Sequence, residues 1–172
     1  LGSDDYRGDT GPLKVNNGNE MQNPLYGAFI EAGHQAGYPK TDDYNACQQE
    51  GFGPMHMNVG GGIRCSASKA YLDPIKKRTN LTIVTHAKVQ RVLLDNKKAI
   101  GVDYEVKGKK YTAVSNKDIV LSAGSIGSPQ LLQLSGIGDQ QDLTNAGIET
   151  LHHLPGVGKN LQDHLEFYFQ FK

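Results

Sequence analysis

Residues 99–106 read Ala-Ile-Gly-Val-Asp-Tyr-Glu-Val, and this stretch indicates the fold more clearly than any other part of the chain. Ile100, Val102, Tyr104 and Val106 occupy every second position, and small or charged residues fill the positions between them. Successive side chains of a strand point to opposite faces of its sheet. A period of two therefore predicts a strand with one buried face.

Flanking segments extend this strand into an antiparallel meander over residues 81–115. They are rich in branched and aromatic residues, which favour strands, and turn-forming residues separate them. The expected neighbouring strands are Leu81–Val84, Val89–Leu94 and Tyr111–Val114, with turns at Asp95-Asn96-Lys97 and Lys107-Gly108-Lys109.

After the meander, the continuous apolar run Ile119–Leu121 is typical of a strand covered on both faces. Ser128-Pro129 then predicts a helix start, because serine caps a helix and proline suits its first position. Further on we expect a helix from Asp139 to Gly147, a short strand at Glu149–Leu151, a tight loop at Leu154–Gly158 and a last strand at Glu166–Phe171.

Before the meander the chain is poorer in regular structure. Residues 1–22 are polar and rich in turn formers, with one short strand expected at Leu13–Val15. Asn23-Pro24 predicts the start of an amphipathic helix that ends at Gly37. Residues 38–65 are expected to be an irregular loop, and Ser66–Ile75 a short helix.

Composition excludes several classes of protein. Eighteen basic and eighteen acidic residues among 172 give a net charge of zero, which argues against a nucleic-acid partner. No apolar run approaches the ~20 residues of a membrane helix, so we expect no integral membrane segment. Cys47 and Cys65 are interpreted as unpaired core residues, which favours a cytoplasmic location; a peripheral place at the inner membrane stays open.

Three places could carry chemistry, and each also has a structural interpretation. The small residues Ser122–Gly127 would let a ligand approach the backbone at a strand-to-helix turn, or would simply make that turn. His56 between two methionines is favoured as structural, because one histidine alone makes no metal site, and we predict none. Glu166 beside Phe167-Tyr168-Phe169 could bind a cation, or end a solvated strand.

The residues Gly124–Gly138, GSIGSPQLLQLSGIG, resemble position for position the second signature of the glucose–methanol–choline family of flavin oxidoreductases. The stretch Leu154–His164, LPGVGKNLQDH, resembles the other hallmark of that family. Gln48–Met55 and Ala70–Leu72 are similar to its choline-oxidising members. The resemblance covers nearly the whole chain and implies an interior fragment of a longer enzyme.

This resemblance implies FAD as cofactor of the full-length protein, with the fragment alone free of flavin and inactive. Val89 is expected at the adenine end of FAD, with Ala123 and Gly124 near the same nucleotide. In choline-oxidising members a glutamate at the position of Glu166 faces the trimethylammonium group of the substrate, and His164 is expected to line the same region. No catalytic residue is assigned, because none of the six histidines lies in the matching motif.

The implied reaction is the oxidation of choline toward glycine betaine, with hydride transfer to the flavin. Two alternatives stay open: a family member that oxidises another alcohol, and a non-catalytic binding module that folds without flavin. The colour of the purified protein and the effect of changing Glu166 would discriminate between them.

The expected fold class is α+β, a meander with flanking helices plus one strand–helix unit of an incomplete FAD-binding Rossmann-like domain. The expected segments are 1–80, a helix and loop region that covers substrate and FAD; 81–116, the meander; 117–148, the strand–helix unit; and 149–172, the start of the substrate domain. Sheet edges left exposed in the fragment predict a homo-oligomer.

Overall fold

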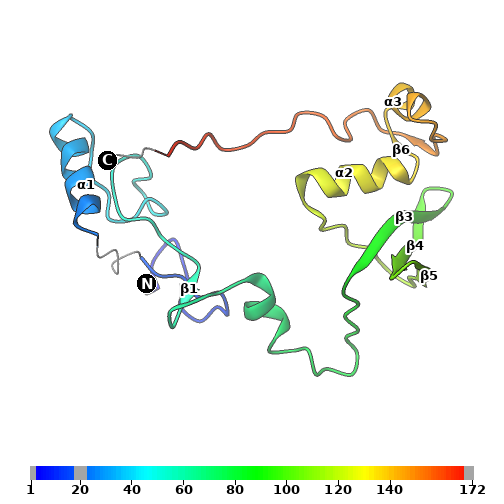
Figure 1. Cartoon of the computed structure of the whole chain (residues 1–172), viewed down its shortest axis with the longest axis horizontal. Coiled ribbons are helices and arrows are strands. Elements are labelled where there is room, and N and C mark those ends of the chain that lie inside the picture. Colours follow the sequence, from blue (N-terminus) through cyan, green and yellow to red (C-terminus); the bar gives the residue numbers. More distant parts are fainter. Residues whose placement is uncertain (1–2, 18–22, 169–172) are drawn as a thin grey trace. The chain divides into compact units, whose positions relative to one another are not determined.

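The computed structural model describes residues 3–17 and 23–168. The chain divides into two compact units, residues 1–83 and 84–172 (Figure 1). Helices and antiparallel strands are mixed along the chain, as the α+β class predicts. No helix within the described ranges is long and apolar enough to cross a membrane.

The first unit begins its regular structure with helix α1, Pro24–Gln35. The Asn23 side chain accepts a 3.0 Å hydrogen bond from the backbone N–H of Leu25, and Pro24 occupies the first turn. The helix start predicted from Asn23-Pro24 is therefore confirmed. Within α1 the buried residue is Gly33, whereas the apolar Leu25 and Phe29 are exposed by 68% and 49%.

The remainder of the first unit is mostly loop. Two short strands, β1 (Val59–Gly60) and β2 (Ile63–Arg64), pair antiparallel, and one π-helical turn, η1, spans Ser68–Leu72. The prediction of a strand at Leu13–Val15 was wrong, because this segment makes only an isolated bridge at its end, between Asn16 and Met57.

The two cysteines lie in different environments. Cys65 is buried and Cys47 is exposed, and both thiols are free. The interpretation of Cys47 as a core residue was therefore wrong, because its segment lies in the exposed loop after Asp43 rather than in a helix or strand.

The second unit contains the predicted meander. Strands β3 (Ala87–Asp95), β4 (Lys98–Val106) and β5 (Lys109–Val114) form one antiparallel sheet in the order β3-β4-β5. The turn at Asn96 has a φ of 54°, and Lys107 and Gly108 have φ values of 50° and 79°. Such positive values suit tight hairpin turns, and both predicted turns are confirmed.

The prediction of a further strand at Leu81–Val84 was wrong. These residues have no regular structure, and the described residues offer them no paired strand. Branched side chains favour an extended backbone, but a strand also needs a neighbour to accept its hydrogen bonds.

The prediction of a strand at Ile119–Leu121 was wrong for the same reason. This segment is irregular and pairs with no described strand. Helix α2 follows and spans Gly124–Leu134, so Pro129 lies inside it rather than at its start. The Ser128 hydroxyl accepts a 3.0 Å hydrogen bond from the backbone N–H of Ala123. The Ser128 hydroxyl therefore binds the backbone of the preceding turn and does not cap a helix that begins at Pro129.

The second unit ends with short elements. Helix α3, Gln140–Asn145, is capped by Asp139, as predicted. Strands β6 (Ile137–Gly138) and β7 (His152–His153) pair in parallel, so the strand expected at Glu149–Leu151 lies slightly later.

The predicted tight loop at 154–158 is confirmed as a run of turns. Residues 166–168 of the expected last strand have no regular structure, and its remaining residues, 169–171, lie outside the described residues. No partner strand among the described residues pairs with this segment, which explains why its aromatic residues alone do not make it a strand.

Candidate functional site

A groove of about 700 Å³ lies in the second unit, where the start of β3 meets the turn before α2. Apolar side chains form most of its wall, from the segment Ile119–Leu121 and from α2 residues Leu131 and Leu134. The predicted cofactor residues Val89 and Ala123 both line it. Residues 34 positions apart in the sequence thus share one surface.

The turn at the end of this groove is built from small residues. Gly124 has a φ of 84°, a backbone conformation that side chains other than glycine rarely adopt. A Cβ atom at Gly127 would stand 3.1 Å from the Cβ atom of Ala123, so the first turn of α2 packs closely on the preceding segment. Gly124 itself does not line the groove; it shapes the turn that places Ala123 there.

The predicted substrate residues Glu166 and His164 lie in the extended segment 161–168. The Tyr168 hydroxyl donates a 2.5 Å hydrogen bond to Oε1 of Glu166, and this carboxylate raises the pKa of Tyr168 above its ordinary value. The backbone N–H of His164 donates to Oδ1 of Asp163 at 2.8 Å. The carboxylate of Glu166 and the hydroxyl end of the Tyr168 ring therefore lie in direct contact.

The structure does not bring these two sets of residues to one cavity. Among the described residues, neither Glu166 nor His164 lines the groove that contains Val89 and Ala123. Leu165 and Phe167, the neighbours of Glu166, are exposed by 84% and 71%. No group of three or more His, Cys, Asp or Glu residues in the described ranges could hold a metal ion.

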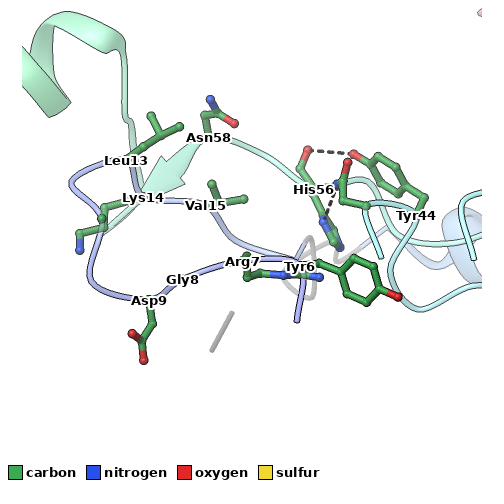
Figure 2. Close-up of a pocket in the computed structure, with 12 residues that line it drawn as sticks. Tyr6, Arg7, Gly8, Asp9, Leu13, Lys14, Val15, Tyr44, His56 and Asn58 are labelled. Atoms are coloured by element: carbon green, nitrogen blue, oxygen red, sulfur yellow. Dashed lines mark hydrogen bonds between the residues drawn. The ribbon is translucent and has the colours of Figure 1, made fainter. Parts of the chain in front are cut away.

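A second cavity, of about 500 Å³, lies in the first unit and was missed by sequence reasoning (Figure 2). His56 lines it, and the His56 side chain is only 4% exposed. Its partners Asp43 and Asn45 come from a separate loop, and Arg7 of the N-terminal segment pairs with the same Asp43. No local pattern around His56 indicates partners that distant.

The side chains of Arg7, Asp43 and His56 form a connected series, with Asp43 in the middle. The Asp43 carboxylate pairs with the Arg7 guanidinium and lies 3.5 Å from Nδ1 of His56. Burial opposes ionisation of Asp43, but the hydrogen bonds from Arg7 and from the backbone of Asn45 outweigh it and lower the Asp43 pKa. Asp43 is therefore an anion at neutral pH, held between two basic side chains.

The chain is similar to curated choline dehydrogenases along almost its whole length. It is 61% identical over 171 residues to the oxygen-dependent choline dehydrogenase of Photobacterium profundum. The match covers 99% of this chain and 30% of that protein. It is 52% identical to the mitochondrial choline dehydrogenase of Homo sapiens, over 99% of this chain and 28% of that protein. The chain thus spans about 30% of the length of the relatives it matches.

Solved structures show the same architecture. The pyridoxine 4-oxidase of Mesorbium loti matches 86% of this chain and 29% of its own, with a TM-score of 0.81 and 34% identity. An FAD-dependent oxidoreductase from Chaetomium thermophilum matches 87% of this chain and 26% of its own, with a TM-score of 0.79 and 29% identity. The family model described as GMC oxidoreductase matches residues 4–166. This chain belongs to the GMC oxidoreductase family.

Proposed function

We propose that this chain forms the interior part of an FAD-dependent choline dehydrogenase. The observation that carries the proposal is the groove that joins Val89 of β3 to Ala123 at the start of α2. Both residues come from the segments that the family resemblance assigns to the adenine end of FAD. The names of the most similar curated relatives support choline as the substrate.

The mainly apolar groove suits the flat face of an aromatic ring such as adenine. Its wall is mainly aliphatic, and the positive φ of Gly124 turns the chain sharply beside Ala123. In the assembled enzyme the backbone of β3 at Val89 would meet the adenine edge, and Ala123 would leave room for the ring. FAD, when bound, supplies the acceptor for the hydride that leaves the alcohol carbon.

Glu166 and His164 are the proposed substrate residues. A quaternary ammonium group has no N–H to donate, so a protein recognises it by negative charge and by the faces of aromatic rings. Glu166 supplies the carboxylate, and its hydrogen bond with the Tyr168 hydroxyl keeps an aromatic side chain near it. The role of these side chains is to hold the cation and so orient the alcohol end of the substrate toward the flavin.

A chimera tests this proposal directly. The matching 171-residue segment of the Photobacterium choline dehydrogenase would be replaced by this chain, which is 61% identical to it. We expect the chimera to retain FAD and to oxidise choline. A folded chimera that binds FAD but ignores choline would contradict the proposed substrate.

The substrate role of Glu166 is tested in the same chimera. Glu166→Gln should raise the KM for choline by roughly tenfold or more, because a partly desolvated cation loses its carboxylate. The uncharged isostere 3,3-dimethylbutan-1-ol should be affected far less. Glu149→Gln, an exposed glutamate elsewhere in the second unit, serves as the matched control.

A second candidate is a family member that oxidises another alcohol. The structural similarity to pyridoxine 4-oxidase, at 34% identity, supports this second candidate. Equal losses on choline and on 3,3-dimethylbutan-1-ol in the Glu166→Gln variant would favour this candidate. Conversion of the aldehyde toward glycine betaine and a cytoplasmic location are parts of the same proposal, and the free thiols of Cys47 and Cys65 support the location.

A further inference from the structure

We infer that Gln90 is a positioning residue for the groove at Val89, and that its hydrogen bond with Glu105 maintains the preference of that groove for adenine. The groove is the one assigned to adenine in the proposed function, on which this inference rests. Gln90 and Glu105 do not line the groove themselves. They act on it through an irregularity in the pairing of β3 with β4.

Strand β3 carries one extra residue at Gln90. Val89 lies opposite Tyr104, and Arg91 lies opposite Asp103, the neighbour of Tyr104. Gln90 therefore has no position of its own in the ladder, which defines a β-bulge. The side chains of Gln90 and Arg91 agree with this, because both line the same hollow on one face of the sheet. In a regular strand, successive side chains lie on opposite faces.

The bulge turns the side chain of Val89 toward the groove. Val102 lines the groove together with Val89, and Val102 lies opposite Val92 in the ladder. Residues directly opposite each other share a face of the sheet, so Val92 lies on the face of the groove as well. Without an extra residue, a position three before Val92 would lie on the other face. Val89 reaches the groove only because Gln90 is inserted between them.

The bulge also turns the backbone of Val89 away from β4. The N–H of Val92 points away from β4, since it donates to the Ser135 hydroxyl at 2.8 Å. The N–H groups of a regular strand alternate between its two edges, and one extra residue reverses the alternation. The N–H and the carbonyl of Val89 therefore face the outer edge of β3, with which no other described strand pairs.

A donor and an acceptor on one residue match the edge of adenine. Adenine presents a ring nitrogen that accepts a hydrogen bond beside an amino group that donates one. The N–H of Val89 would donate to the ring nitrogen, and its carbonyl would accept from the amino group. Hypoxanthine has an oxygen in place of that amino group, so the carbonyl of Val89 would face a second acceptor. The groove therefore selects the 6-amino purine.

Glu105 holds the bulge in its register. The amide nitrogen of Gln90 donates a 3.0 Å hydrogen bond to Oε2 of Glu105, and the contact is partly buried. Glu105 lies opposite Lys88, on the other side of Val89 from Gln90. The bond thus spans the position of Val89. It opposes a slip of one residue, which would turn the side chain of Val89 to the other face of the sheet.

The test uses the chimera described above, freed of flavin and titrated with FAD and with flavin hypoxanthine dinucleotide while flavin fluorescence is followed. We expect FAD to bind about tenfold more tightly, because the 6-oxo purine leaves the Val89 carbonyl without a donor. Gln90→Glu places two carboxylates in contact and should reduce this ratio about three- to tenfold. The double variant Gln90→Glu with Glu105→Gln exchanges donor and acceptor and should restore the ratio.

Thr112→Val is the matched control. It removes a side-chain hydrogen bond beside the same hollow, but in β5 and away from the bulge, and should leave the ratio unchanged. Equal affinity of the unaltered chimera for both dinucleotides would overturn the inference and leave the proposed function standing. An unchanged ratio in Gln90→Glu, no recovery in the double variant, or an equal loss in Thr112→Val would do the same. A chimera that binds no FAD would overturn the proposed function and this inference together.

Discussion

The backbone N–H of Val92 donates a 2.8 Å hydrogen bond to the hydroxyl oxygen of Ser135, and both residues are buried. The same hydroxyl donates to the backbone carbonyl of Leu131 at 2.6 Å. One side chain at the end of α2 therefore satisfies an otherwise unpaired N–H of β3 and a carbonyl of its own helix. This bond ties helix α2, which lines the groove at Val89, to the sheet.

Ser135→Ala should destabilise the second unit by about 1–3 kcal/mol, because it leaves the Val92 N–H buried without an acceptor. Thermal or urea unfolding of the chain measures the change. Ser115→Ala is the matched control, since its hydrogen bonds are solvent-exposed, and it should stay within about 0.5 kcal/mol. Equal effects in the two variants would contradict the role assigned to Ser135.

Arg91, Asp103 and Thr112 form a cross-strand ladder of side-chain hydrogen bonds over β3, β4 and β5, and its contribution to stability depends on pH. The pKa of Asp103 is lowered from its ordinary 3.8, chiefly by the hydrogen bond from Thr112 and then by that from Arg91. A lowered folded-state pKa means that Asp103 stabilises the fold above pH 3.8 and that this contribution is lost as the pH falls further.

Acid unfolding followed by circular dichroism checks this direction. Asp103→Asn should be less stable than the unaltered chain at neutral pH, and the difference between them should shrink in acid. Asp118→Asn, which changes an exposed carboxylate outside the ladder, should retain the full dependence on pH. A constant difference between Asp103→Asn and the unaltered chain at all pH values would count against the ladder.

Two glycines of α1 should respond to alanine in opposite ways. A Cβ atom at Gly33 would lie 2.5 Å from the ring of Phe52, whose ring already packs between Phe29 and Tyr38 at centroid distances of 5.4 and 5.5 Å. Gly33→Ala should cost about 1–3 kcal/mol through overpacking.

Gly27→Ala meets no atom within 4 Å and should stabilise the helix by about 0.5–1 kcal/mol. Unfolding of both variants under one set of conditions measures the contrast. Stabilisation by both substitutions would show that Phe52 does not pack on Gly33 in solution.

Strand β5 is an edge of its sheet, and all six of its residues are exposed. We expect the chain to self-associate through this edge, because unpaired N–H and carbonyl groups template a further strand. The N–H of Ser115 bonds inward to Ile100, so alternation along the strand directs the N–H of Val114 outward.

Light scattering over a range of concentrations should show a mass above that of one chain, and Val114→Pro should return it to the monomer. Circular dichroism would verify that the variant still folds. A monomer for the unaltered chain at every concentration would refute self-association.

The isolated chain should purify without colour and should not oxidise choline. Its sequence has no Gly-x-Gly-x-x-Gly fingerprint after a strand, the motif that holds the pyrophosphate of a dinucleotide in Rossmann-type domains. Visible absorbance and choline-dependent dye reduction measure the two properties. Flavin absorbance that survives gel filtration would contradict this prediction.

The features that the sequence alone determined are those whose hydrogen bonds close within a few residues. Asn23 caps α1, Asp139 caps α3, and the turns at Asn96 and at Lys107-Gly108 join the three strands as predicted. Each of these depends on side chains and φ preferences of the turn itself. The alternation in 99–106 likewise predicted β4. The assignment of Val89 and Ala123 to a cofactor site stays a prediction.

Only the tertiary structure decided the features whose partners lie far along the chain. Ile119–Leu121 has the composition of a buried strand, but no described strand pairs with it. Ser135 looks like a helix-stop residue in the sequence, yet it accepts a bond from a residue 43 positions away. His56 lies 3.5 Å from Asp43, which also pairs with Arg7, and no local sequence pattern connects these residues to His56. The physical reason is the same in each case, because a hydrogen bond or an ion pair between distant segments depends on how the chain is folded back on itself.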